Sequence, residues 1–132
     1  MPAEVIAVFD IGKTNKKFLL FDEGLMIVHE EEVQFVEIPD DDGFPGDDIT
    51  HLESWMHKCL DAAINTGAYL IKALNFATYG ATLIYLGPDG ERLTPAYNYL
   101  KPMPEDILNG FYEKYGVLRS LAGRRHHPPL EC

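Results

Sequence analysis

Basic residues and long apolar segments are scarce in this sequence, and each scarcity excludes a class of protein. Eleven Lys and Arg stand against 21 Asp and Glu, which gives a net charge of −10. A surface that binds nucleic acid or an anionic membrane would need a basic patch. No apolar run approaches the roughly 20 residues of a membrane span, and the first residues do not have the pattern of a signal peptide. We therefore expect neither nucleic acid nor a membrane as a partner.

Cysteine is also rare, because only Cys59 and Cys132 occur in 132 residues. Two cysteines are too few for a disulfide framework, so the sequence predicts a reducing, cytoplasmic location. Cys59 falls in an expected helix, where we expect a buried thiol rather than a reactive one. The length is that of about one domain, and 46% hydrophobic residues suffice for a globular core.

A nucleotide-binding P-loop is excluded by a missing glycine. Gly12-Lys13-Thr14 has the right ending, but the pattern G-x-x-x-x-G-K-[ST] needs a first glycine where this chain has Ala7. A P-loop also leads into a helix, whereas Lys17–Phe21 has the pattern of a strand. The turn must therefore act in another way if it binds phosphate.

The hydrophobic pattern predicts strands and helices in the order β-β-β-α-β-β, followed by extended chain and a second helix. Three strands so close together are expected to pair as an antiparallel meander, and the whole order indicates α/β architecture. The strands are expected at 5–9, 17–22, 25–36, 71–77 and 82–86, and the helices at 50–66 and 105–115.

Local signals mark the ends of these elements. Thr50 with Glu53 three residues later has the pattern of a capping box at the start of the first helix. Gly116 is expected to end the second helix, and Pro88-Asp89-Gly90 predicts a tight turn. Residues 39–48 are rich in Pro, Gly and Asp and are expected to form a loop.

The first turn has the residue types of a phosphate and metal site. Asp10 at a strand end can hold Mg²⁺ through water, and Gly12 lets the backbone approach a phosphate closely. Hydroxyl, amide and backbone N–H donors follow, with lysines to neutralise charge. On spacing alone, the same residues fit a polar hairpin with solvated lysines slightly better. The candidate phosphate-binding residues are Asp10, Gly12, Lys13, Thr14, Asn15 and Lys17, with Asp10 also the water-mediated Mg²⁺ ligand.

The pattern Asp10-x-Gly12-x-x-Asn15-x-Lys17-x-x-x-x-Asp22 resembles the first phosphate motif of the FGGY carbohydrate kinases, D-x-G-T-x-S-x-R-x-x-x-x-D. Lys13 stands where the family usually has Thr. The resemblance extends over residues 4–116 and implies an incomplete ribonuclease-H-like lobe of the actin-like ATPase superfamily, with a mixed sheet. It further implies ATP and Mg²⁺ as cofactors and a parent enzyme that phosphorylates a sugar hydroxyl.

The same resemblance implies where a sugar would bind. In the family, the turn after the fourth strand and the segment after the fifth face the sugar, which here are residues 78–81 and 95–99. F-A-T-Y-G-A-T is similar to the D-T-W-G-V-D segment of rhamnulokinases, and the chain is closest in character to rhamnulokinase- and xylulokinase-type enzymes. The acidic positions of that segment are Ala77 and Thr82 here, and the W-x-D-x-R motif of relatives is missing. The implied substrate-binding residues are Tyr79, Gly80, Tyr97 and Asn98, whose aromatic members equally fit a protein core.

Two groups of potential metal ligands fail on their spacing. Residues 40–43 look like a calcium loop, but with Gly43 at the sixth position both the first and the twelfth ligand positions would fall on isoleucine. His51 and His57 are six residues apart and do not share a helix face as an i, i+4 zinc pair would. We expect no metal at either group.

The last segment, residues 117–132, differs in character from the rest of this acidic chain. Its three Arg and one Glu make it net positive. Relatives continue at this point with a segment like V-A-E-F-S-R-K-T-A-S-P-A-L-G-M-L. The tail and a stop codon can be back-translated into a DNA sequence. When that DNA sequence is read in another frame, from its third nucleotide, it encodes this continuation. We therefore expect residues 1–116 to be part of an N-terminal kinase lobe and residues 117–132 to be a frameshift product.

The resemblance places the catalytic Asp and most of the adenine site beyond this point, so it implies no catalytic residue in this chain and an inactive product. Two alternatives remain open. One is a standalone phosphate- or nucleotide-binding module without catalysis. The other is an interaction module, dimeric through the apolar sheet surface that an incomplete lobe leaves uncovered.

Overall fold

The structure is a computed structural model that describes residues 1–116. The chain divides into two units, the first spanning Met1–Tyr99 and the second beginning at Leu100. The predicted frameshift tail, residues 117–132, lies outside the described residues. The predicted strands and the predicted first helix all fall within the first unit.

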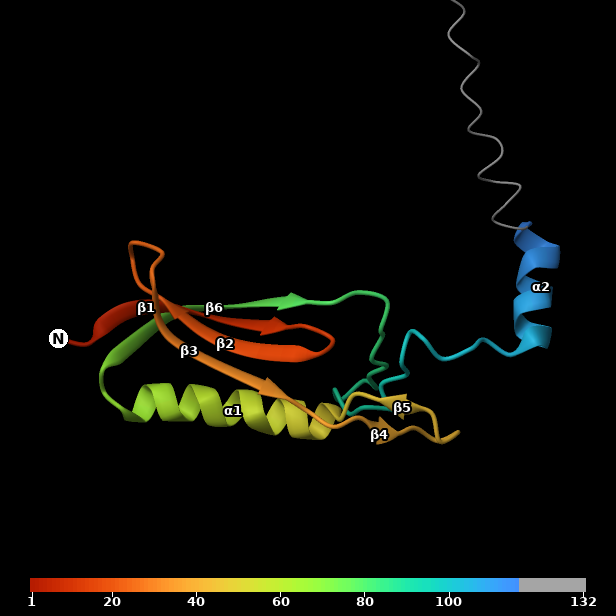
Figure 1. Cartoon of the computed structure of the whole chain (residues 1–132), viewed down its shortest axis with the longest axis horizontal. Coiled ribbons are helices and arrows are strands. Elements are labelled where there is room, and N and C mark those ends of the chain that lie inside the picture. The colour runs from red at the N-terminus through yellow and green to blue at the C-terminus, as the bar shows by residue number, and fades with distance from the viewer. Residues whose placement is uncertain (117–132) are drawn as a thin grey trace, which may run out of the picture. The chain divides into compact units, whose positions relative to one another are not determined.

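The first unit is built on a four-stranded mixed sheet with the strand order β3-β2-β1-β6 (Figure 1). An antiparallel meander runs through β1 (Ala3–Ile11), β2 (Asn15–Phe21) and β3 (Ile27–Gln34). A helix, α1 (Ile49–Asn65), covers one face and leads into β6 (Tyr69–Thr78), which pairs parallel with β1. The predicted meander and the predicted α/β fold with a mixed sheet are confirmed.

Alternation along the strands sorts side chains between the two faces. On β1 the odd-numbered residues from Val5 to Ile11 are buried against α1, whereas Asp10 is exposed on the opposite face. The Phe9 ring is fully buried, with its centroid 4.8 Å from that of Phe18 and 5.7 Å from that of Trp55. This aromatic group anchors the helix to the sheet.

A small hairpin lies between the meander and α1. Its strands, β4 (Ile38–Pro39) and β5 (Pro45–Gly46), enclose the acidic loop, where the sequence predicts a loop without strands. The Asp40 side chain accepts hydrogen bonds from the backbone N–H groups of Asp42 and Phe44, both at 2.9 Å. These bonds close the loop.

The capping box predicted at Thr50 is wrong. The helix begins at Ile49, and Asp48 is the N-cap residue, since its carboxylate accepts from the backbone N–H of His51 at 2.9 Å. Thr50 and Glu53 instead accept hydrogen bonds from the Arg92 guanidinium at 2.8 and 2.7 Å. Asp and Thr are both favoured N-caps, so the local pattern did not separate two positions so close together.

The strand predicted at residues 82–86 is also wrong. This stretch makes a single isolated bridge, between Leu86 and Arg92, around the tight turn that ends at Gly90. Leu83 and Leu86 are 67% and 59% exposed. An apolar stretch becomes a strand only when a neighbouring strand pairs with it, and among the described residues none pairs with the outer edge of β6.

The second unit contains α2 (Glu105–Tyr115), at the predicted place. It ends at Gly116 with φ of 81°, a value that favours glycine. Its apolar side chains include Phe111 and Tyr115, whose rings are 5.0 Å apart. Neither helix of residues 1–116 is long and apolar enough to cross a membrane.

Candidate functional site: the β1–β2 turn and the segments that meet it

The turn between β1 and β2 requires a glycine for steric reasons. A Cβ atom on Gly12 would lie 2.6 Å from the carbonyl oxygen of Asn15, so any other residue would open the turn. Thr14 is exposed at its tip. The motif glycine is therefore a structural requirement of the hairpin as well as a candidate phosphate-binding position.

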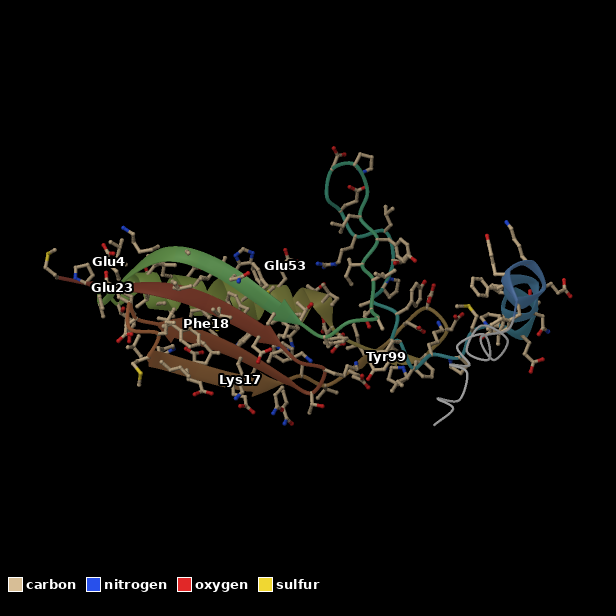
Figure 2. The ribbon with its side chains drawn as sticks, turned by 90° about the horizontal axis from the view of Figure 1, so that it is seen from above. Glu4, Lys17, Phe18, Glu23, Glu53 and Tyr99 are labelled. Carbon is tan, nitrogen blue, oxygen red and sulfur yellow. The ribbon has the colours of Figure 1, made fainter. Side chains whose placement is uncertain are left out.

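On the face opposite α1, Asp10 and Lys17 are cross-strand neighbours. The Lys17 ammonium lies 3.3 Å from the carboxylates of both Glu30 and Glu32. Hydrogen bonds to Glu32 and then Glu30 raise the pKa of Lys17. Figure 2 labels Lys17 and the next residue of β2, Phe18. Phe18 is buried in the hydrophobic core with residues of α1. Within residues 1–116, no side chain hydrogen-bonds or pairs with the exposed Asp10 carboxylate.

These residues fit a Mg²⁺-bound phosphate. The Asp10 carboxylate is exposed and unpaired in the described part of the chain, as a water-mediated Mg²⁺ ligand requires. The Asn15 side chain accepts a hydrogen bond from Gln34 through Oδ1 at 2.6 Å, which leaves its NH₂ group as a donor. The Thr14 hydroxyl is exposed beside it.

A second polar group lies on the α1 face of the same turn and centres on a buried lysine. Lys16 is only 2% exposed, at the inward-facing end of β2. Its ammonium donates to the backbone carbonyl of Lys13 at 2.8 Å and to Asp47 Oδ1 at 3.2 Å. A buried ammonium is costly unless it is paired and hydrogen-bonded, and Asp47 supplies the opposite charge.

Asp47 receives two more donors on Oδ2, the Lys13 ammonium at 3.0 Å and the Tyr79 hydroxyl. Burial raises the pKa of Asp47, but hydrogen bonds from Tyr79, Lys13 and Lys16 outweigh burial, so the pKa lies below its ordinary value. Burial and the bond to Asp47 together raise the pKa of Tyr79 to about 12. We call Lys13, Lys16, Asp47 and Tyr79 the Asp47 network.

Tyr79 reaches this network because β6 runs parallel to β1. Its backbone N–H donates to the carbonyl of Ile11 at 3.1 Å, so the end of β6 is tied to the start of the β1–β2 turn. The Lys13 ammonium lies 5.7 Å from the Tyr79 ring centroid, within cation–π distance. Gly80 follows in open space, where an added Cβ would meet no atom within 4 Å.

Asn98 joins the same group through Glu37. Asn98 is 8% exposed, and its amide donates to the Pro45 carbonyl at 2.9 Å and to Glu37 at 3.4 Å. The Glu37 carboxylate also lies 2.7 Å from the Lys13 ammonium. Tyr97 donates instead to Asp41 at 2.8 Å, on the acidic loop.

The candidate residues therefore fall into two groups on opposite faces of the sheet. Lys13, Tyr79 and Asn98 are brought together on the α1 face. Asp10 and Lys17 lie on the other face. Gly12 and Thr14 belong to the turn that connects both faces.

Sequence reasoning missed three members of the site: Lys16, Glu37 and Asp47. A signal for Lys16 was present, because alternation along β2 places it on the same face as Phe18 and Leu20. A lysine at an inward position needs a buried carboxylate. The sequence offers many carboxylates and does not say which one reaches it.

The acidic loop is a separate feature. Carboxylate oxygens of Asp40, Asp41 and Asp42 lie within 4.8 Å of one another. Asp40 accepts from two backbone N–H groups, and Asp41 accepts from Tyr97. These bonds account for the loop geometry, and we assign no metal to it.

Comparison with known proteins identifies the fold. No family model matches the chain, and no curated protein matches it by sequence. Among solved structures, glycerol kinase from Plasmodium falciparum with ADP superposes with a TM-score of 0.65 at 23% identity, over 86% of this chain. Gluconate kinase from Lactobacillus acidophilus gives a TM-score of 0.71 at 19% identity, over 89% of this chain.

The chain has a carbohydrate-kinase fold. The predicted resemblance to carbohydrate kinases and the structural likeness agree on the same group of proteins. The chain spans about a quarter of each kinase, since 24% of each of those chains is covered. The kinase-like fold of this chain therefore corresponds to an incomplete lobe.

Proposed function

We propose that the chain is part of an ATP-dependent carbohydrate kinase of the FGGY family. The observation that carries this proposal is the meeting of the β1–β2 turn with the turn after β6, through Asp47 and the Tyr79–Ile11 backbone bond. Phosphate-binding and sugar-binding segments of a kinase must adjoin, because the phosphoryl group passes between them. The kinase-like fold supports the same assignment.

In this proposal, the exposed face of the turn binds the nucleotide. Asp10 holds the waters of Mg²⁺, Thr14 and Asn15 donate to phosphate oxygens, and Gly12 keeps the turn closed, with Lys13 and Lys17 as the nearby cations. Bound ATP would supply the phosphoryl group. Tyr79, Gly80, Tyr97 and Asn98 are proposed to line the sugar side. None of residues 1–116 is assigned as a catalytic base, so we propose that the chain alone does not transfer phosphate.

Isothermal titration of the whole chain with Mg·ADP tests the nucleotide role. We expect binding that is lost in Asp10→Ala while the circular dichroism spectrum is unchanged. Asp61→Ala is the matched control, because it removes an exposed carboxylate from α1. Absence of binding by the wild-type chain, or equal binding by Asp10→Ala, would contradict the role given to the turn.

We propose, in addition, that residues 117–132 are translated in a shifted frame. The tail lies outside the described residues, and its composition and the alternative reading support the proposal. Sequencing the coding DNA from the Gly116 codon tests it directly. A frame that continues T-A-S-P-A-L-G-M-L and later encodes G-x-x-D is the expected result, and three frames without this continuation would refute it.

A homodimer is the second candidate, favoured by the outer edge of β6. Leu70, Leu74 and Phe76 of this strand are 46%, 44% and 52% exposed. Among residues 1–116 no strand pairs with its outer edge, and such an edge is a template for another strand. We expect a concentration-dependent dimer in sedimentation velocity that Leu74→Lys abolishes. His57→Lys, at an exposed position of α1, adds the same charge and should have no effect. A wild-type chain that stays monomeric would exclude this candidate.

A further inference from the structure

We propose that Asp47 is a positioning residue that couples the phosphate turn to the sugar-facing turn, an inference that rests on the proposed function. Lys13 belongs to the first turn and Tyr79 to the second, and both donate to the same carboxylate oxygen, Asp47 Oδ2. Two donors that share one acceptor compete for its charge. A change at one donor therefore reaches the other without any movement of the backbone.

The buried Lys16 ammonium holds the Asp47 carboxylate in place for this role. Its other oxygen, Oδ1, accepts from Lys16, which also donates to the backbone carbonyl of Lys13. Only 9% of the Asp47 side chain and 2% of the Lys16 side chain are exposed. Burial of this kind keeps water from replacing either partner, so the position of the carboxylate is defined.

The network also sets which hydrogen bonds Tyr79 offers a substrate. The hydroxyl proton of Tyr79 is committed to Asp47, so the phenol oxygen is an acceptor toward any other group, whether the Thr82 side chain or a ligand. It therefore suits a group that donates, such as a sugar or polyol hydroxyl. A carboxylate or phosphate at that position would face an oxygen with no proton to give.

The coupling predicts a response to phosphate. A phosphoryl oxygen at the turn attracts the Lys13 ammonium, which also contacts Glu37 at 2.7 Å and is 24% exposed. When Lys13 leaves Oδ2, the bond from Tyr79 to that oxygen strengthens. Occupancy of the phosphate turn thus fixes the Tyr79 hydroxyl more firmly before the sugar is bound.

A double-mutant cycle of Lys13→Gln and Tyr79→Phe tests the coupling without any ligand. Phe keeps the ring over which the Lys13 ammonium lies, so the cycle isolates the hydroxyl. We expect the unfolding equilibrium constant of the double variant to differ from the product of the single effects by about threefold or more. Lys17→Gln with Tyr79→Phe is the control, because Lys17 binds Glu30 and Glu32 on the other face. Additive effects for Lys13 and Tyr79 would overturn the proposal.

The second readout is the ¹³Cζ resonance of Tyr79, assigned by its loss in Tyr79→Phe. We expect Mg·ADP to shift it in the wild-type chain and not in Lys13→Gln. Mg·ADP that binds without moving this resonance would refute the coupling while leaving the nucleotide role intact. Mg·ADP that does not bind would contradict the proposed function, and the cycle would still decide whether Lys13 and Tyr79 are coupled where they share Asp47.

Discussion

At the scale of single residues, the buried ammonium of Lys16 has the largest energetic consequence. It occupies the first inward position of β2, where the next inward residues of the same strand are Phe18 and Leu20. Such a charge is tolerated only with a partner of opposite sign and a further acceptor, and it has both in Asp47 and the Lys13 carbonyl. The pair is therefore a constraint on the fold as well as on the site.

Removing one partner of this pair should be costly. We expect Asp47→Asn to lower the free energy of unfolding by about 3 kcal/mol, because Lys16 stays buried without a counter-charge. Lys16→Met replaces the ammonium by an apolar side chain of similar length and should cost less than Asp47→Asn. Urea unfolding followed by fluorescence of Trp55 measures both. A larger loss in Lys16→Met would show that the ion pair itself, rather than its burial, stabilises the fold.

Acid should weaken the same pair. Since the folded-state pKa of Asp47 lies below its ordinary value of 3.8, the carboxylate contributes stability that is fully present above that value. The contribution is lost as the pH falls through the lower, folded-state pKa. We expect the stability difference between the wild type and Asp47→Asn to shrink between about pH 5 and pH 2. A difference that is constant over this range would contradict the lowered pKa.

Cys59 should react slowly with thiol reagents. Its thiol is buried under α1, and burial, with the negative charge of Glu31 3.6 Å away, raises its pKa to about 12. A thiol reacts through its thiolate. In a Cys132→Ser background, we expect Cys59 to react about 100-fold more slowly in buffer than in urea. Equal rates of Cys59 modification in buffer and in urea would show that α1 opens readily in the folded chain.

At the scale of the elements, helix ends were harder to predict than helix bodies. The spacing of apolar residues in α1 follows from the helical repeat, and Leu52, Cys59 and Ala63 are buried as that repeat requires. The cap depends on which of several suitable side chains turns back onto the backbone. Thr50 could not do so because it points to Arg92.

Substitutions should separate the two cap candidates. We expect Asp48→Ala to lower the free energy of unfolding by about 1 kcal/mol, since it leaves the His51 N–H without its acceptor. Thr50→Ala removes only an exposed bond to Arg92 and should cost about 0.5 kcal/mol or less. Thermal unfolding followed by circular dichroism measures both. A larger loss of unfolding free energy in Thr50→Ala than in Asp48→Ala would show that Thr50 is the N-cap residue.

At the scale of the whole molecule, the chain consists of two units, and the sheet, α1 and the Asp47 network all belong to the first. The main hydrophobic cluster, between the sheet and α1, is made of residues from Val5 to Ile71. The described part of the second unit, residues 100–116, holds α2 and contributes none of these core residues. Folding of the first unit should therefore depend little on the second.

A chain of residues 1–99 tests this independence. We expect it to unfold cooperatively at a temperature within about 3 °C of the full chain, because every core residue among the described residues lies before residue 100. Differential scanning calorimetry of both chains measures the difference. A truncated chain that does not unfold cooperatively would show that the second unit is needed to complete the first.

The sequence alone determined the meander and the bodies of both helices, although it indicated a first strand buried on both faces where Ile6 and Asp10 are exposed. These features depend on periods of two and 3.6 residues, which act between close neighbours in the chain. The sequence also carried the kinase-like motif around Gly12, whose turn is a local structure.

The tertiary structure alone decided which partners meet. Lys16 and Asp47 are 31 residues apart, and Asp47 and Tyr79 are 32 apart. Their contacts depend on how β6 returns beside β1 and on where the β4–β5 hairpin leads into α1. For the same reason the apolar residues 82–86 form no strand, because the path of the chain does not pair them with the edge of β6 that the described residues leave open. The local periodicity of the sequence specifies which face of a strand or helix a residue lies on. The path of the chain specifies which distant residues come into contact.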